Sequence, residues 1–137
     1  MEIRKIIIDT NAYSEFKRGN KDAFEVIRNA ETIFMSPIVL GEILSGFILG
    51  KKSEQNRKEL LEFLSSGRVQ QITIDGETSQ QFAEIFKELK KIGKPIPTND
   101  IWIAASARQH NLAVLTYDSH FGYISGIKVV SSKPDLK

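Results

Sequence analysis

The chain has 137 residues, of which 41% are hydrophobic and 26% are charged, with only 4 prolines. This length and composition predict one globular domain over residues 1–137 and argue against a disordered chain. The absence of cysteine excludes disulfides, thiolate metal sites and cysteine nucleophiles, and a net charge of +2 is too small to indicate a nucleic-acid-binding protein by itself.

The amino-terminal segment "MEIRKIII" places charge ahead of only three isoleucines. This apolar run is too short for the core of a secretory signal and far too short for a membrane span. We therefore expect a cytoplasmic protein with no membrane segment.

Short segments rich in Ile, Val and Thr alternate along the chain with longer helix-patterned segments. The expected strands are residues 3–9, 32–36, 69–74, 112–117 and 127–131, and the expected helices are about residues 13–18, 21–30, 37–50, 53–65, 76–92 and 99–110. Candidate helix starts are Pro37 in a first turn and caps at Ser53, Asp75, and either Thr98 or Asn99. This alternation predicts an α/β three-layer sandwich, with a central, mostly parallel five-stranded sheet flanked by helices.

Two of the predicted strands lead to an aspartate. Asp9 follows three isoleucines in "KIIIDTNAY", and Asp118 follows the apolar segment "LAVLTY". In open parallel sheets, ligand sites lie beyond the carboxyl ends of the strands, so these two carboxylates become neighbours if their strands are adjacent. The alternative at each position is local: Asp9 would cap the following turn and Asp118 would start a loop.

Glu42 lies in a strongly apolar helical segment, "SPIVLGEILSGFILG". Apolar residues occur on nearly every side of this predicted helix. An ionised Glu there requires a cation, or a raised pKa that leaves it neutral, unless its carboxylate reaches solvent. We expect part of residues 38–49 and the later "LLEFL" to be covered by a second copy of the chain, which predicts a homodimer; the alternative is a fully internal core helix.

Asp100 opens the last long helix, in "KPIPTNDIWIAASARQ". An acidic residue in a first turn complements the helix dipole and needs no other purpose. The small residues Ala104, Ala105 and Ala107, however, allow this helix to approach the sheet closely. Such an approach brings Asp100 to the rim where the strands end.

Four separated carboxylates, Asp9, Glu42, Asp100 and Asp118, are thus expected at one edge of one sheet. Like charges share a pocket only when something positive joins them. Oxygen ligands without Cys or a paired-His motif favour Mg²⁺ or Mn²⁺ over zinc. With these acids set aside, the remaining surface is basic, which suits a polyanionic substrate. Candidate basic patches are Lys17, Arg18 and Lys21; Lys51 and Lys52; and Lys87, Lys90, Lys91 and Lys94.

The four acidic positions resemble the pattern of a PIN-domain nuclease of the VapC toxin type. "IIIDTNAY" is similar to that family's opening strand and first Asp, "SPIVLGEIL" to its Glu-bearing helix, "PTNDIWIAASA" to its third acid and "VLTYDSHF" to its fourth. Each motif alone is short and common, but all four occur in order over nearly the whole chain.

The resemblance implies Mg²⁺- or Mn²⁺-dependent hydrolysis of RNA, a homodimer and, in toxins, silencing by a cognate antitoxin. Asp9, Asp100 and Asp118 would be metal ligands, with Glu42 a ligand or an anchor for metal-bound water. Polar neighbours expected to orient ligands or water are Thr10, Asn11, Ser36, Thr98, Asn99 and Thr116. The chain has only two histidines, His110 and His120. We assign neither a role, although His120 follows Asp118 closely enough to touch substrate.

Other functions are weaker fits. A haloacid-dehalogenase phosphatase needs a second Asp where this chain has Asn11, and a receiver-type signalling domain needs a Lys that "LAVLTYD" lacks. A 5′-flap nuclease usually carries extra helices for which this chain has no length. A housekeeping PIN nuclease in RNA processing shares the same acids and stays an alternative. So does a non-catalytic RNA-binding module, which would need no acidic cluster.

Overall fold

The computed structural model describes residues 2–137. Its centre is a five-stranded sheet in which every neighbouring pair of strands is parallel. The strands lie in the order β3-β2-β1-β4-β5. Their bounds are β1 Lys5–Ile8, β2 Thr32–Met35, β3 Val69–Gln71, β4 Ala113–Leu115 and β5 Lys128–Val130. All five strands expected from the sequence are present, each shorter than its apolar segment.

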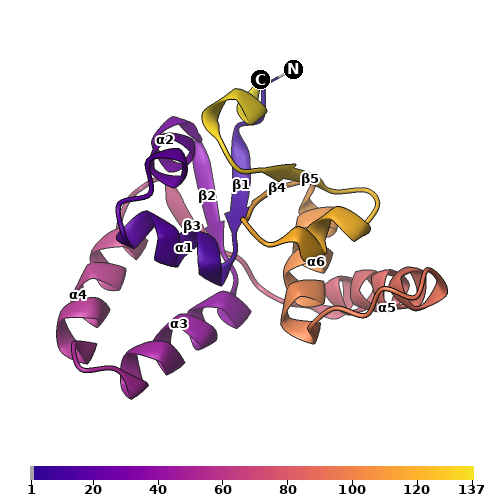
Figure 1. The fold of residues 1–137 in the computed structure, drawn as a ribbon, viewed down its shortest axis with the longest axis horizontal. Coiled ribbons are helices and arrows are strands. Elements are labelled where there is room, and N and C mark those ends of the chain that lie inside the picture. The colour runs from indigo at the N-terminus through magenta and orange to yellow at the C-terminus, as the bar shows by residue number, and fades with distance from the viewer. Residues whose placement is uncertain (1) are drawn as a thin grey trace.

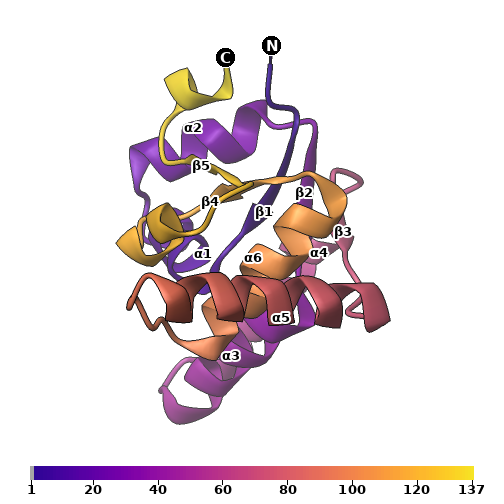
Figure 2. The same cartoon turned by 90° about the vertical axis from the view of Figure 1, so that its right-hand side faces the viewer.

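Helices cover both faces of this sheet. Their bounds are α1 Thr10–Lys17, α2 Lys21–Asn29, α3 Pro37–Leu49, α4 Ser53–Leu64, α5 Gly76–Lys91 and α6 Thr98–His110, with short 3₁₀ helices η1 Ser119–Tyr123 and η2 Lys133–Leu136. Figure 1 shows α1, α2 and α4 to the left of the sheet and α5 and α6 to its right. Figure 2, seen from that right-hand side, has α6 and α5 in front of the strands. The predicted three-layer α/β sandwich is confirmed.

The central strand explains why both faces are covered. Ile6, Ile7 and Ile8 are all fully buried, although successive side chains of a strand point to opposite faces. A strand of a parallel sheet buried on both faces reads as a continuous apolar run rather than an alternating one. On the right-hand face, Ala104, Ala105 and Ala107 of α6 are also buried, as their small size predicts.

Local signals fix most helix starts, with two corrections. Asp75 begins α5 through a capping box with Thr78, because each side chain satisfies a backbone N–H that the helix leaves unpaired. Ser53, in contrast, lies inside α4, which has no side-chain cap. Helix α6 likewise has Pro97 at its N-cap position and no side-chain cap, so the expected cap at Thr98 or Asn99 is wrong.

The carboxyl ends of the strands therefore meet at one edge of the sheet, where α1, α3 and α6 begin. Ile8 pairs with Leu115 in the register of β1 and β4. The backbone N–H of Asp9 continues this pairing by donating to the Leu115 carbonyl at 3.3 Å. Within residues 2–137, no helix combines the length and apolarity needed to cross a membrane.

Candidate active site

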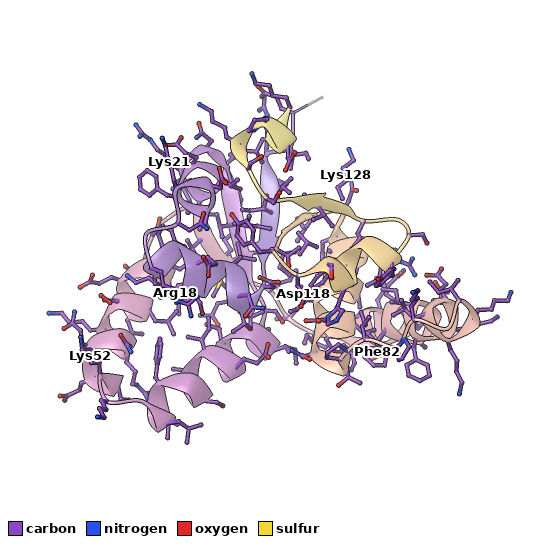
Figure 3. All side chains as sticks on the ribbon, in the orientation of Figure 1. Arg18, Lys21, Lys52, Phe82, Asp118 and Lys128 are labelled. Atoms are coloured by element: carbon purple, nitrogen blue, oxygen red, sulfur yellow. The ribbon has the colours of Figure 1, made fainter. Side chains whose placement is uncertain are left out.

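A small cavity of about 160 Å³ opens at this edge of the sheet. Its walls are Asp9, Thr10, Asn11, Glu42, Pro97, Asn99, Asp100 and Asp118. The four carboxylates singled out in the sequence therefore all line one cavity, although they come from four different segments. Figure 3 shows Asp118 near the middle of the molecule, in the region between β1 and α6.

Asp9 is held rigidly at the end of β1. Its side chain is 3% exposed, and Oδ1 accepts a hydrogen bond from the backbone N–H of Ala12 at 2.7 Å, which caps α1. Oδ2 accepts a hydrogen bond from the Thr116 hydroxyl. The pKa of Asp9 is raised to about 6, chiefly by burial; the two hydrogen bonds oppose this rise, and the charges of Asp100 and Asp118 add to it. Asp9 thus acts as a helix cap and also as a wall of the acidic cavity.

Asp118 is positioned by the turn that follows β4. Its backbone N–H donates to the Thr116 hydroxyl oxygen at 2.9 Å. Its Oδ1 in turn accepts from the backbone N–H of His120 at 2.9 Å, which caps η1. Asp118 therefore caps η1, and its carboxylate also lines the cavity.

Asp100 and Asp118 share the imidazole of His120. Nδ1 of His120 lies 3.1 Å from Oδ2 of Asp100 and 3.0 Å from Oδ1 of Asp118. Burial raises the pKa of Asp100, and the hydrogen bond from His120 counteracts that rise. One potential ligand atom from each of these three residues lies within 4.8 Å of the others, an arrangement that could hold a metal ion.

His120 was not predicted as a site residue. The signal was its spacing of two residues from Asp118, which a 3₁₀ turn converts into a contact. His110 is exposed near the end of α6 and outside the cavity lining.

Glu42 joins three helices at the cavity. Its Oε1 accepts a hydrogen bond from the Thr10 hydroxyl at 2.7 Å, and its Oε2 accepts one from the Asn99 side-chain amide at 2.7 Å. The carboxylate is half-buried, and among residues 2–137 no Lys, Arg or His forms an ion pair with it. Two neutral donors therefore hold the anion, one from α1 and one from α6.

The other polar residues predicted around the site fall into two groups. Thr10, Asn11 and Asn99 line the cavity, and Thr116 stands behind Asp9. Ser36 and Thr98 are not part of the lining. Ser36 is buried and its hydroxyl oxygen caps α3 by accepting from the N–H of Ile38 at 3.1 Å. Its role in the structure is thus to start the helix that carries Glu42.

The cavity brings four carboxyl groups together. Without a cation, burial and the charges of neighbouring carboxylates raise the pKa values of Asp9 and Asp100, and a bound divalent cation would favour their charged forms. Carboxylate and amide oxygens with one imidazole are suitable donors for such an ion. Basic residues lie outside the lining: Figure 3 shows Arg18, Lys21 and Lys52 on the side of the molecule formed by α1, α2 and α4.

Comparisons with known proteins match this chain over most of its length. The model of the PIN domain family matches residues 6–127. Ribonuclease VapC2 of Rickettsia felis is 32% identical over 114 residues, which cover 80% of this chain and 84% of that protein. VapC ribonuclease Y4jK of Sinorhizobium fredii is 31% identical over 137 residues, covering 92% of this chain and 96% of the relative.

Solved structures show the same fold. The crystal structure of VapBC2 from Rickettsia felis, bound to a DNA fragment from their promoter, contains a chain that superposes with a TM-score of 0.82 at 27% identity. The match covers 94% of this chain and 99% of that one. DNA-bound VapBC from Salmonella typhimurium gives a TM-score of 0.82 at 26% identity, covering 93% and 98% of the two chains.

Proposed function

This chain belongs to the PIN domain family, and we propose on that premise that it is a metal-dependent endoribonuclease of the VapC type, the toxin of a toxin-antitoxin pair. The observation that carries the proposal is the convergence of Asp9, Glu42, Asp100 and Asp118 on one cavity at the carboxyl edge of a parallel sheet. The relatives that are 31% and 32% identical over most of this chain are named as ribonucleases, which supports RNA as the substrate.

The proposed cofactor is a divalent cation, Mg²⁺ or Mn²⁺, held by Asp9, Asp100 and Asp118. The raised pKa values of the buried Asp9 and of Asp100 support this assignment, because attraction to a cation would offset the desolvation and repulsion that cause them. When bound, such an ion acidifies a water molecule and offsets charge on the phosphoryl oxygens during phosphodiester hydrolysis. Glu42 is proposed as a further ligand or as a hydrogen-bond acceptor for water at the site.

The chain's own residues contribute by fixing these carboxylates in advance. Thr116 orients Asp9 from behind, and Thr10 and Asn99 hold the two oxygens of Glu42. His120 bridges Asp100 and Asp118. Groups held in place before the substrate arrives need little reorganisation during reaction, which is how an enzyme gains from electrostatic stabilisation.

We also propose a homodimer and a cognate antitoxin as partners. Ile48 and Leu49, at the end of α3, are 69% and 88% exposed, and Leu61, in the last turn of α4, is 66% exposed, so among residues 2–137 these parts of the apolar segments predicted to need a cover lack one. Apolar surface of this kind marks an interaction site. The solved relatives are VapBC complexes, which supports an antitoxin partner. The proposed compartment is the cytoplasm, where its RNA substrate occurs.

Cleavage of a structured RNA pool by the purified, antitoxin-free protein tests the function. We expect cutting in Mg²⁺ or Mn²⁺, none in EDTA, and none by Asp100→Asn. Asp22→Asn, which changes an exposed Asp on α2, is the matched control and should cut normally. If the folded protein retains RNA affinity but never cuts under any of these metals, it is a binding module and the nuclease proposal is wrong.

A further inference from the structure

A second, larger cavity lies beside the acidic one. It has a volume of about 420 Å³ and is formed by residues of α1, α3 and α4. Thr10 and Glu42 line both cavities, so the two share a wall. Cavities of a few hundred cubic ångströms are the usual size for binding a small organic group. An RNA strand cut at the acidic cavity therefore has a compartment next to the scissile phosphate.

Two polar side chains of this second cavity have no hydrogen-bond partner among residues 2–137. The hydroxyl of Tyr13 is buried and unpaired. Asn56, half-buried on α4, forms no side-chain hydrogen bond within the chain. Nearly all buried polar groups in proteins are paired, and leaving one unpaired lowers stability. A ligand in the cavity would supply a partner for the Asn56 amide, and it would reach the buried Tyr13 hydroxyl after a shift of the ring toward the cavity.

The Tyr13 hydroxyl stays protonated over the working range of pH. Burial and, to a lesser extent, the nearby charge of Glu59 raise the pKa of Tyr13 to about 12. It is therefore available as a hydrogen-bond donor. The Asn56 amide offers both a donor and an acceptor. Together they can form hydrogen bonds with the edge of a ligand that carries both donors and acceptors.

The rest of the lining favours an uncharged, flat ligand. Ile43 and Phe47 contribute apolar surface. The two cationic side chains at the cavity already form ion pairs. Lys17 Nζ lies 3.6 Å from Glu59 Oε2, and Arg18 Nη1 lies 2.7 Å from Glu15 Oε1. A site with paired charges, an apolar wall and unpaired polar groups suits a nucleobase better than a phosphate. Single-stranded RNA is recognised in this way, by bases that leave the stack and enter pockets.

We propose that this second cavity is a base-binding subsite that receives one RNA base next to the scissile phosphate, with Asn56 and Tyr13 contacting its polar edge. The inference rests on the proposed ribonuclease function and adds to it a source of sequence preference. A peptide segment of a partner protein is the competing occupant, and it would leave the nucleotide preference of the enzyme unchanged when these residues are altered.

The test is cleavage of an RNA library with randomised nucleotides on both sides of the cut, read by sequencing the product ends. Wild type should prefer particular bases at one flanking position. Asn56→Ala and Tyr13→Phe should each reduce that preference roughly tenfold, the effect of about one lost hydrogen bond, while preferences elsewhere persist. Gln55→Ala, an exposed neighbour on α4, is the matched control and should leave the profile unchanged.

An abasic nucleotide at the preferred position separates base recognition from a general defect. It should slow wild type more than it slows Asn56→Ala, because the variant has already lost one of the contacts that the abasic nucleotide removes. Thermal denaturation guards against misfolding: Tyr13→Phe deletes an unpaired buried hydroxyl, so its melting temperature should equal or exceed that of wild type.

Three outcomes overturn the inference: a wild type without flanking preference, variants with the wild-type profile, or additive effects of the abasic substrate and Asn56→Ala. Absence of any cleavage by wild type contradicts the proposed function instead, so the two failures are distinct.

Discussion

Thr116 donates its hydroxyl hydrogen to Asp9, a residue 107 positions earlier in the chain. The same oxygen accepts the backbone N–H of Asp118 at 2.9 Å. One hydroxyl therefore orients two carboxylates that follow adjacent strands. Such a donor also favours the ionised form of Asp9, which burial opposes.

Replacement of this hydroxyl should change how cleavage depends on pH. Thr116→Val keeps the shape but removes the donor and the acceptor, so the pKa of Asp9 should rise above its value of about 6. We expect the acidic limb of the pH-rate profile to move to higher pH, with a loss of about 1–3 kcal/mol in the free energy of unfolding. Thr116→Ser should restore the profile. A valine variant whose profile superimposes on that of wild type would contradict the positioning role.

Asp9 should destabilise the metal-free protein at neutral pH. Its pKa is about 6 when folded against a reference of 3.8, so the folded state binds more protons in between. The contribution of Asp9 to stability is complete below pH 3.8 and is lost as pH rises through about 6, a change on the order of 3 kcal/mol. Asp9→Asn should therefore be more stable than wild type at pH 8 in EDTA, and this difference should vanish near pH 4.

Denaturant titrations at several pH values measure this difference. Asp22→Asn is the control, because that carboxyl is exposed on α2. Added Mn²⁺ should then stabilise wild type more than Asp9→Asn at pH 8. A stability difference that does not vary with pH would rule out the raised pKa as its cause.

The contribution of Glu42 to RNA cleavage should depend on the charge of its carboxylate and on the ability of both oxygens to accept hydrogen bonds. In Glu42→Gln the Thr10 hydroxyl still finds an oxygen, but the new amide faces the Asn99 amide, so donor meets donor. We expect kcat/KM for RNA cleavage to fall at least about tenfold, which corresponds to about 1.4 kcal/mol. Glu54→Gln, at an exposed position in the first turn of α4, should leave it unchanged. Normal kcat/KM in Glu42→Gln would exclude a role in the reaction.

His120 should affect the ionisation of Asp100, one of the two carboxylates that its imidazole contacts. Its hydrogen bond lowers the pKa of Asp100 against the effect of burial. In His120→Ala that pKa should rise, and cleavage at pH 6 should fall more than cleavage at pH 8. His110→Ala, on the exposed end of α6, is the control. Equal losses at both pH values would show that the imidazole acts in some way other than on Asp100.

The exposed apolar ends of α3 and α4 should mediate self-association. Ile48→Glu and Leu61→Glu introduce charge at side chains that are 69% and 66% exposed, so the monomer should tolerate them while a dimer through this surface should not. Sedimentation at tens of micromolar should show a dimer for wild type and a monomer for the pair of changes. Ile92→Glu, at an apolar residue 56% exposed after α5, should remain dimeric. A monomeric wild type would end the dimer proposal.

Much of the secondary structure could be predicted because its signals are local. Continuous isoleucines predicted the central strand, and Asp75 and Pro37 marked helix starts that the structure confirms. Helix α1 begins at Thr10, earlier than the expected residue 13, because Asp9 caps it. The expected start of α6 at Asn99 was close, but its expected cap was wrong because Pro97 occupies the cap position. Boundaries depend on such contacts more than on apolar periodicity.

The sequence by itself determined which segments are strands and helices, and it placed Asp9, Asp100 and Asp118 near the ends of such elements and Glu42 within an apolar helix. Only the tertiary structure decided which acids are neighbours. Asp9 and Asp118 meet because β1 pairs with β4, a strand formed over a hundred residues later. The bonds from Thr10 and Asn99 to Glu42, and the position of His120 between two aspartates, likewise join separate elements. Local patterns record the propensity and burial of each segment, whereas strand order and side-chain contacts follow from how all segments pack together.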